Sequence, residues 1–563
     1  MRPEHGRGGG EEMLLAGAAA CLGVAAFVWL WGQLAGVLFG AGWPHVTPGQ
    51  VLAILARLPA RLATPRAAWP LAARADLPGP AGFYVLLAPL LGIVAGTVLA
   101  AVRPARPGSP RAHGPARWAG PADLRSLRRR PRDGTGPRLA LGRARGRLLR
   151  AERRHALVVF GPPQAGKSAG LAVPALLEWV GPVVASSIKT DLLQATIERR
   201  RSLGPVMIFD PFGLSDGPSQ AWSPLRAATT WDGALEAAWR LASAGELDQR
   251  RVDGGEFWAV AAEQRLAPLM FAAAGTGGGM ERVLRWAYGQ DTRELGESLR
   301  RVADHAPDEA RLADARAAYD SARAFESQAD RTRSSIEATT QALLRAYRFT
   351  RVARSAATSE ITPEALLQSN ATLYLVGDAK ASKLLRPIFI ALISEIVDRA
   401  YELAARGGGR LERPLLLCLD EAGNIAPLPN LAEIASTAPS HDIQLVSVFH
   451  DLAQARHRYG QQAETVINSH RARMLLPGVA DLDTLRYFSG LAGETEVRDL
   501  TRTSGAGGST RSVTRRARAL AAPEALRQLA PGRALLLYGR LPPVEVRLRM
   551  WFEDRRLRRL ARS

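Results

Sequence analysis

Short runs of consecutive apolar residues, bounded by Gly, Pro or Asp, recur between residues 156 and 479. Because the apolar residues are continuous rather than alternating, both faces of each run should be covered, which is typical of a parallel β-sheet between two layers of helices. Helical stretches separate the runs, so the pattern predicts an α/β nucleotide-binding architecture. The predicted strands are ALVVFG (156–161), PVVASS (182–187), PVMIFDP (205–211), ATLYLVG (371–377), PLLLCLDE (414–421), IQLVSVFH (443–450) and ARMLLPGV (472–479).

The long segment between the third and fourth runs shows no strand pattern. In DGALEAAWRLASA, EFWAVAAEQRLAPLMFAAA and DEARLADARAAYDSARAF the apolar residues recur at intervals of three and four, the spacing of one face of a helix. We therefore expect residues 228–365 to form an inserted all-α domain. The nucleotide-binding domain is then divided into residues 138–227 and 366–563.

The chain after the last run has two parts with different patterns. RTSGAGGSTRSVTRRARA (502–519) is rich in Gly, Ser and Arg, and we expect a mobile loop. ALLLYGRLPPVEVRLRMWF (534–552) alternates apolar and polar residues, which predicts a closing β-hairpin.

Two uncharged apolar stretches predict transmembrane helices near the N-terminus. Residues 13–40 and 79–102 are each long enough to cross ~30 Å of hydrocarbon. A cleavable signal peptide is the alternative for the first stretch, but its apolar core usually has only about 7–15 residues. Arginines follow the second stretch, so the positive-inside rule places the rest of the chain in the cytoplasm. The prediction is a two-pass protein of the cell membrane, with residues 1–12 cytoplasmic and 41–78 exterior.

Positive charge is concentrated just after the second apolar stretch. The whole chain carries a net charge of +21, and residues 103–154 contain sixteen Arg against three acidic residues. This excess suggests an anionic neighbour, either lipid headgroups or nucleic acid. The segment 103–137 is also rich in Pro and Gly, a composition that does not fold alone, so it is predicted to be a basic juxtamembrane tether.

Length and cysteine content exclude some classes of protein. With 563 residues, 47% of them hydrophobic, the chain can bury more than one core, which argues against a single small binding module. Its two cysteines, Cys21 and Cys418, each lie within an apolar run. They can form neither a disulfide framework nor a zinc site.

A phosphate-binding motif follows the first predicted strand. GPPQAGKS matches G-x-x-x-x-G-K-[ST], in which backbone N–H groups wrap phosphates, the lysine reaches the β- and γ-phosphates and the hydroxyl holds Mg²⁺. The following LAVPALLEWV can form a helix whose N-terminus favours anions. The alternative is a glycine-rich turn without a ligand, but lysine is rare here, with only Lys167, Lys189, Lys380 and Lys383. The predicted nucleotide-binding residues are Gly161, Pro162, Pro163, Gln164, Ala165, Gly166, Lys167 and Ser168.

Two acidic residues, Asp420 and Glu421, end the fifth predicted strand. In P-loop nucleotide hydrolases the first carboxylate holds metal-bound water and the second polarises the attacking water. Acidic residues also mark strand ends that only face solvent, so the pair is informative because a P-loop is expected in the same sheet. We expect Ser168 and Asp420 to form the Mg²⁺ site and Glu421 and Lys167 to be catalytic.

Polar residues also follow the sixth predicted strand. His450 and Gln454 lie where side chains of such folds can contact the γ-phosphate. No second His or Cys stands at ligand spacing from His450, so a metal-ligand role has no support. A γ-phosphate sensor and a helix cap are the two remaining interpretations.

Together these features resemble the coupling proteins of type IV secretion, the TraG/TraD-type conjugative DNA-transfer ATPases. The resemblance extends from the two apolar stretches through GPPQAGKSAGLAVPALLEW, SSIKTDLLQATIERRRSLGPVMIFDP, WSPL and LDEAGN to RHRYG and GRALLLYGRLPPVEVR. SSIKTDLL and FDPFG are most similar to the actinobacterial branch. Lys189 and Asp191 match one of these segments, but no role can be assigned to them.

The resemblance implies a RecA-like P-loop NTPase with an inserted all-α domain and two N-terminal transmembrane helices. It implies a membrane-anchored homo-hexamer that uses ATP and Mg²⁺ to move relaxase-bound single-stranded DNA, or protein cargo, to inner subunits of a secretion channel. The family usually has Gln at the end of the sensor strand and again four residues later, whereas this chain has His450 and then Gln454. Histidine can donate to phosphate, but its charge changes near neutral pH.

Two other functions fit parts of the pattern. An FtsK-like double-stranded DNA translocase would end in a winged-helix reader, for which the tail after residue 480 has too little apolar periodicity. A membrane docking receptor for protein cargo would use its nucleotide site only as a switch. Glu421 discriminates against that receptor, since a switch needs no base beside the metal-binding carboxylate.

Overall fold

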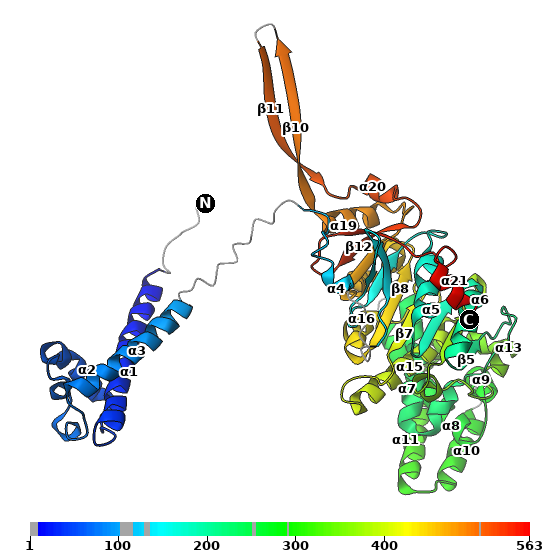
Figure 1. The fold of residues 1–563 in the computed structure, drawn as a ribbon. Coiled ribbons are helices and arrows are strands. Elements are labelled where there is room, and N and C mark those ends of the chain that lie inside the picture. The colour runs from blue at the N-terminus through cyan, green and yellow to red at the C-terminus, as the bar shows by residue number, and fades with distance from the viewer. Residues whose placement is uncertain (1–8, 102–115, 129–135, 250–254, 290–291, 506–507) are drawn as a thin grey trace, which may run out of the picture. The chain divides into compact units, whose positions relative to one another are not determined.

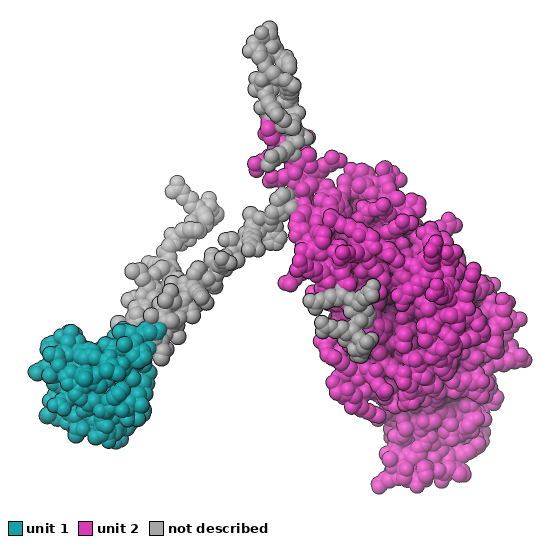
Figure 2. Space-filling view, in the orientation of Figure 1, with its two compact units in different colours: residues 1–114 teal, residues 115–563 magenta. Residues whose placement is uncertain are grey.

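An eleven-stranded β-sheet runs through the larger of two compact units in the computed structural model (Figures 1 and 2). The units comprise residues 1–114 and 115–563. The structure describes residues 9–101, 116–128, 136–249, 255–289, 292–505 and 508–563.

Seven neighbouring strands of the sheet are parallel, in the order β9-β3-β8-β7-β4-β6-β5. They coincide with the seven predicted runs, and nearly all of their residues are buried. The prediction of a mostly parallel α/β sheet is therefore confirmed. The strands are β3 (Leu157–Phe160), β4 (Val183–Ser187), β5 (Val206–Phe209), β6 (Thr372–Val376), β7 (Leu415–Leu419), β8 (Ile443–Phe449) and β9 (Ala472–Leu475).

Successive residues of these strands enter two different buried clusters, one on each face of the sheet. In β3, for example, Val158 and Phe160 belong to one cluster, whereas Leu157 and Val159 belong to the other. The helices α5 (Val173–Glu178) and α6 (Asp191–Leu203) cover the second face. The first face is covered by α15 (Ala379–Arg406), α16 (Leu431–Thr437), α17 (Leu452–Tyr459), α18 (Ala463–Ser469) and α19 (Leu482–Ala492).

Four antiparallel strands extend the sheet beyond β9. The predicted closing hairpin is confirmed as β12 (Arg533–Tyr538) and β13 (Val544–Arg547), and β12 pairs directly with β9. A further hairpin, β1 (Ala140–Ala144) and β2 (Arg147–Arg150), was not predicted, because its alternating arginines hide the apolar face. Arg145 and Gly146 form its turn with φ of 50° and 75°, values that favour a two-residue hairpin.

Between β5 and β6 the described residues form helices only. Most buried residues of these helices belong to the cluster on the first face of the sheet, and Ala261, Phe325 and Ile336 form a small separate cluster within the insertion. The helices are α7 (Trp231–Gln249), α8 (Gly255–Gly275), α9 (Met280–Gly289), α10 (Thr292–Asp304), α11 (Glu309–Glu326), α12 (Asp330–Leu344), α13 (Thr350–Arg354) and α14 (Pro363–Leu367), with short 3₁₀ turns at Pro224–Thr229 and Arg345–Arg348.

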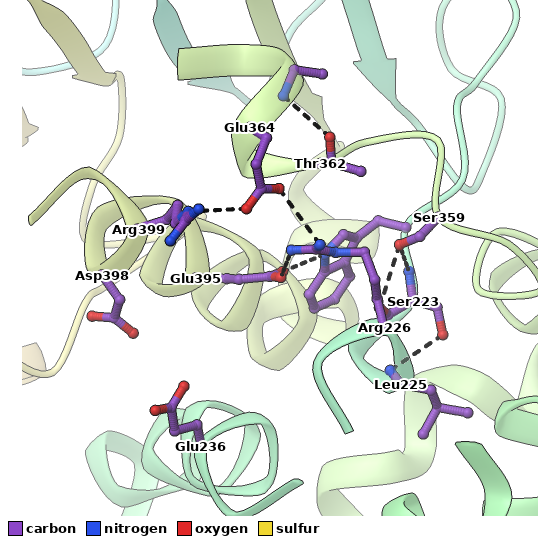
Figure 3. A network of polar contacts seen from close by, with 12 residues as sticks. Ser223, Leu225, Arg226, Glu236, Ser359, Thr362, Glu364, Glu395, Asp398 and Arg399 are labelled. Atoms are coloured by element: carbon purple, nitrogen blue, oxygen red, sulfur yellow. Dashed lines mark hydrogen bonds and ion pairs between the residues drawn. The ribbon is translucent and has the colours of Figure 1, made fainter. Parts of the chain in front are cut away.

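A buried polar network joins the start and the end of this helical insertion to α15 (Figure 3). Glu395 accepts a hydrogen bond from Trp222 Nε1 at 2.8 Å and one from Arg226 at 2.5 Å. Glu364 of α14 bridges Arg226 at 3.5 Å and Arg399 at 3.0 Å. The WSPL segment that contains Trp222 is thus fixed to α15 by charge-assisted hydrogen bonds.

We expect Glu395→Ala to destabilise the larger unit by about 2–4 kcal/mol, because it leaves a buried indole N–H and a partly buried guanidinium without their shared acceptor. Urea unfolding of the full chain, followed by tryptophan fluorescence, measures the change. Glu236→Ala is the matched control, since the Glu236 carboxylate is 61% exposed and Arg240, its partner, keeps a second ion pair with Asp398, so the loss should stay below about 1 kcal/mol. Equal losses in the two variants would contradict the prediction.

The smaller unit contains α1 (Gly9–Phe39), α2 (Pro48–Arg57) and α3 (Pro80–Ala101). Trp31 Nε1 donates to the carbonyl oxygen of Phe83 at 2.8 Å, and both rings lie against Trp69. None of the helices in the described part of the chain is long and apolar enough to cross a membrane. The transmembrane helices predicted for residues 13–40 and 79–102 are thus not shown, and the side chains of residues 9–22 and 93–101 lie outside the described ones.

The predicted basic tether, residues 103–137, falls mainly on positions outside the described residues. Its described part, residues 116–128, packs against the larger unit instead of extending freely. Ala119 N–H donates to the carbonyl oxygen of Pro543 at 2.9 Å, and Leu124 and Leu127 are buried. Buried apolar side chains and backbone hydrogen bonds thus anchor part of a segment whose overall composition predicts no fold of its own.

The prediction of a loop at residues 502–519 is wrong. The backbone forms a long antiparallel ribbon of β10 (Glu494–Gly505) and β11 (Gly508–Ala519), seen at the top of Figure 1. The run contains Thr and Val among the arginines, and Gly505 pairs with Gly508 as the last described pair of the ribbon. Its Gly and Ser content therefore did not exclude two long strands.

Candidate nucleotide-binding site

The P-loop connects β3 to a helical segment that starts with a π-helical turn at Ser168–Ala172 and continues as α5. Gln164 and Gly166 have φ of 65° and 87°, so the loop curls back and exposes its backbone N–H groups. Lys167 is only 7% exposed, and its Nζ donates to the carbonyl oxygen of Gly161 at 2.8 Å. Burial lowers the pKa of Lys167, and the charges of Glu421 and Asp420 oppose that change.

Ser168 and Asp420 meet across the loop although 252 positions separate them in the chain. The Ser168 hydroxyl donates to Oδ2 of Asp420 at 2.5 Å, while Oδ1 of Asp420 is buried and has no hydrogen-bond partner among the described residues. Burial raises the pKa of Asp420 to about 6, against the effect of the Ser168 hydrogen bond and Lys167. An unmatched buried carboxylate oxygen beside a hydroxyl fits a divalent cation with oxygen ligands.

Glu421 lies next to Asp420 in a left-handed backbone conformation, with φ of 66°. Such a conformation is uncommon for a residue with a side chain and persists where surrounding contacts impose it. Asn424 Nδ2 donates to Oε2 of Glu421 at 2.8 Å, and His450 Nε2 lies 3.5 Å from the same oxygen. Burial alone would raise the pKa of Glu421, but these contacts with His450 and Asn424 outweigh it and lower the pKa. Glu421 is therefore held as a carboxylate.

His450 connects the P-loop lysine to this carboxylate. Its Nδ1 lies 3.1 Å from Lys167 Nζ, and an ammonium group only donates, so Nδ1 acts as the acceptor. The proton of the neutral ring is then on Nε2, which faces Glu421. This assignment follows from the hydrogen-bond partners. The three side chains form one polar chain from Lys167 through His450 to Glu421.

Gln454 holds two residues around Glu421, His450 and Asn424, by hydrogen bonds. Its Oε1 accepts from the backbone N–H of His450 at 2.7 Å, and its Nε2 donates to Oδ1 of Asn424 at 3.2 Å. The backbone N–H of Gln454 in turn donates to Asp451, the residue that caps α17. Of the two predicted sensor residues, His450 lines the cavity described below, whereas Gln454 does not.

Seven of the eight predicted P-loop residues, Pro162 to Ser168, line a cavity of about 1020 Å³ together with Asp420, Glu421 and His450, and the eighth, Gly161, is buried beside it. Lys189 and Asp191, which had no role assigned from their motif, line it as well. A volume of this size accommodates a nucleotide. The predicted phosphate, metal and base residues therefore lie around one space.

Sequence reasoning missed part of the cavity wall. Asn424 lies within LDEAGN and had no predicted role, although its position three residues after Glu421 is a usable signal. Residues from the C-terminal part close the opposite side, and no motif marks them. Trp551 N–H donates to the carbonyl oxygen of Ala169 at 3.0 Å, and a Cβ added to Gly166 would lie 2.7 Å from Met550 Cε. The C-terminal wall consists of Arg527, Leu529, Pro531, Gly532, Arg547, Leu548, Met550, Phe552 and Glu553.

Similar solved structures share this fold. The bacterial conjugative coupling protein TrwBdeltaN70 in an unbound form has a TM-score of 0.58 and 18% identity, over 77% of this chain and 92% of that one. Plasmid coupling protein TrwB in complex with the ATP analogue ADPNP also gives 0.58 and 18%, over 77% and 93%. The complex of TrwB with ADP and Mg²⁺ gives 0.56 and 18%, over 77% and 94%.

Proteins with similar sequences are also conjugal transfer proteins. Two proteins from Escherichia coli, each named conjugal transfer protein TraG, are 24% identical over 422 residues and 23% identical over 424 residues. Each alignment covers 68% of this chain and 65% of the relative, so the similarity spans slightly less than two thirds of those proteins. The family described as type IV secretory system conjugative DNA transfer matches residues 122–562. The chain therefore belongs to the type IV secretory system conjugative DNA transfer family.

Proposed function

We propose that this chain is an ATP-hydrolysing coupling protein that moves conjugative DNA. One observation carries the proposal. At the P-loop, the Ser168 hydroxyl donates to buried Asp420, whose second carboxylate oxygen has no hydrogen-bond partner among the described residues, and the Glu421 carboxylate lies beside them. TrwB, which shares the fold, has been crystallised with ADPNP and with ADP and Mg²⁺, and those ligands support the same cofactors here.

The residues present fit ATP and Mg²⁺. The P-loop backbone N–H groups and Lys167 would hold the phosphates, while Ser168 and Asp420 would hold the cation. When bound, Mg²⁺ neutralises charge on the phosphate oxygens. Glu421 orients water and accepts its proton. His450 contacts both Glu421 and Lys167 and holds their side chains in position.

We further propose that the cargo is relaxase-bound single-stranded DNA, or protein, delivered to inner subunits of a secretion channel. The family description and the conjugal transfer relatives support DNA transfer. A homo-hexamer follows from the resemblance to RecA-like coupling proteins. The proposed cargo and the proposed hexamer extend the ATPase proposal, and each can be tested separately from it.

Hydrolysis of ATP by the purified full chain, with and without single-stranded DNA, tests the proposal. We expect DNA to stimulate hydrolysis, and a scrambled basic peptide mixed with the same DNA serves as a control for charge alone. Intact nucleotide binding with hydrolysis that DNA leaves unchanged would instead favour the docking receptor for protein cargo.

Membrane attachment through α1 and α3 is also a proposal, based on the uncharged stretches 13–40 and 79–102. We place the larger unit in the cytoplasm on the positive-inside rule. Alkaline carbonate extraction of cell membranes tests it. The full chain should stay in the pellet, and its release into the supernatant would overturn two-pass insertion.

We expect His450→Ala to reduce the turnover rate of ATP about 10–100-fold while nucleotide affinity changes less than about threefold, because the variant disconnects Glu421 from Lys167 without touching the phosphate-binding backbone. His450→Gln should retain more activity, since an amide can still donate to Glu421. Steady-state hydrolysis and binding of a fluorescent ATP analogue measure the two effects. A loss of affinity as large as the loss of rate would show that His450 mainly binds nucleotide.

A further inference from the structure

A second cavity, of about 910 Å³, lies between the helical insertion and the start of α15. Its walls come from the end of α7, the last turns of α12, the loop after β5 and the first turns of α15. It shares no lining residue with the nucleotide cavity. We propose that this cavity binds single-stranded nucleic acid, an inference that rests on the proposed function and identifies where the cargo strand is held.

Positive charge on one rim is the first reason. Arg345, Lys380 and Lys383 line the cavity and are exposed. No described residue forms an ion pair with any of the three. The acidic residue on the rim, Asp378, accepts hydrogen bonds from the backbone N–H groups of Lys380 and Ala381 as the N-cap of α15. The cavity wall therefore presents three cations that form no ion pair with a described residue, which suits a phosphate backbone.

The choice of lysine at this rim is the second reason. The chain uses Arg for nearly all of its basic positions, and Lys380 and Lys383 are half of its four lysines. Of the other two, Lys167 belongs to the P-loop and Lys189 lines the nucleotide cavity. Lysine offers a compact, freely rotating charge instead of a rigid fork, which suits a phosphate backbone that must slide past without a fixed register. All four lysines thus follow strands β3, β4 and β6 at the carboxyl edge of the parallel sheet.

An aromatic surface beside the cations is the third reason. Phe349 is 48% exposed, and its ring contacts that of Phe212 edge to face at 5.9 Å between centroids. Both rings line the cavity with Leu214 and Leu384. Exposed aromatic rings next to basic side chains are the means by which proteins hold unpaired bases without sequence preference. An acidic peptide would match the charge but would leave the open phenyl ring without a stacking partner.

A third, smaller hollow connects this cavity to the nucleotide site. It shares Leu214 and Asp378 with the proposed strand-binding cavity, and Lys189 and Asp191 with the nucleotide cavity. Lys189 and Asp191 follow β4, and Asp378 follows β6, which is the neighbour of β4 in the sheet. Movements of the loop after β4 on nucleotide binding would therefore reach the rim of the strand-binding cavity through adjacent residues. This arrangement gives Lys189 and Asp191 a place between the two sites.

The test is binding of fluorescein-labelled oligo-dT to the purified full chain, measured by anisotropy across a range of salt concentrations. Lys380→Ala/Lys383→Ala should weaken binding about tenfold or more and reduce the slope of log K against log salt by about 1.4, the value for two single-strand phosphate contacts. Phe349→Ala should weaken binding at least fivefold with the slope unchanged. Arg316→Ala/Arg331→Ala removes the same charge from two exposed positions of the insertion that do not line the cavity, and should change binding less than twofold.

The outcomes separate this inference from the proposed function. If the wild-type chain binds no oligo-dT and its ATP hydrolysis does not respond to it, the DNA function itself fails. If the wild-type chain binds and the lysine variant binds as well as the arginine control, only the placement in this cavity is overturned. Basal ATP hydrolysis without DNA should be equal in all variants, which confirms that each is folded.

Acetylation footprinting provides a test that needs no variant. Because the chain has only four lysines, mass spectrometry after treatment with an amine-reactive acetyl ester resolves each of them. Oligo-dT should protect Lys380 and Lys383, and a non-hydrolysable ATP analogue should protect Lys167. Protection of Lys380 and Lys383 by poly-glutamate but not by oligo-dT would assign the cavity to an acidic protein segment and overturn the inference.

Discussion

Lys167→Ala is expected to abolish ATP hydrolysis, lowering the rate at least 100–1000-fold, the effect of removing one charge-stabilising group from a closed site. Lys167 is nearly fully buried, and its ammonium group contacts the Gly161 carbonyl and His450, a position that no other cation of the cavity wall occupies in the described residues. Its loss also leaves Asp420 and Glu421 as adjacent acids without their shared counter-charge. Nucleotide affinity should fall together with the rate.

Hydrolysis and binding of a fluorescent ATP analogue measure the two losses, and a thermal melt shows whether the variant is folded. Lys167→Arg is the informative companion, since it keeps the charge but replaces a compact ammonium by a planar group in a space enclosed by Gly161 and His450. We expect it to be nearly as inactive as the alanine variant. Activity of Lys167→Ala within threefold of wild type would refute the assignment of this loop as the phosphate site.

Glu421→Gln is expected to separate binding from hydrolysis. The substitution keeps the size of the side chain and its acceptor for Asn424, but it removes the carboxylate that accepts a proton from water. The turnover rate should fall about 10²–10⁴-fold, the usual contribution of a general base, while ATP affinity stays within about threefold. Single-turnover hydrolysis and equilibrium binding measure these two quantities.

Asp420→Asn is the contrasting variant, because Asp420 rather than Glu421 contacts Ser168. It should make ATP binding insensitive to Mg²⁺, whereas Glu421→Gln should bind ATP with the Mg²⁺ dependence of the wild-type chain. DNA transfer in cells that survived Glu421→Gln but not Lys167→Ala would support the docking receptor, in which nucleotide acts only as a switch.

The sequence was sufficient to predict the parallel part of the sheet, because a strand buried on both faces consists of consecutive apolar residues. Residues such as those of β7, Leu415–Leu419, are all buried, so no polar position interrupts the run. Asp420 could be placed near Ser168 for a related reason, since carboxyl ends of parallel strands share one edge of a sheet. The apolar runs locate the strand ends in the sequence, and the parallel pairing brings those ends to one edge of the sheet.

Long-range pairing was harder to predict. The β10–β11 ribbon is stabilised by cross-strand hydrogen bonds, and neither strand is marked by a continuous apolar run. The hydrogen bonds from Gln454 to His450 and Asn424 depend on the separation of two loops, which the sequence does not record. Met550 and Trp551 contact the P-loop although nearly the whole sequence of the larger unit separates them from it. Only the folded chain therefore shows that they close the nucleotide site.

That closure by the C-terminal part has a consequence for synthesis on the ribosome. The P-loop leaves the exit tunnel early, but the strand that carries it, β3, pairs with β9, and β9 pairs with β12 in the last part of the chain. A nascent polypeptide therefore holds an unfinished phosphate-binding loop while the helical insertion and the rest of the sheet are translated. Because Met550 and Trp551 close the wall of the nucleotide cavity, we expect truncated products that lack them to bind ATP poorly and not to hydrolyse it.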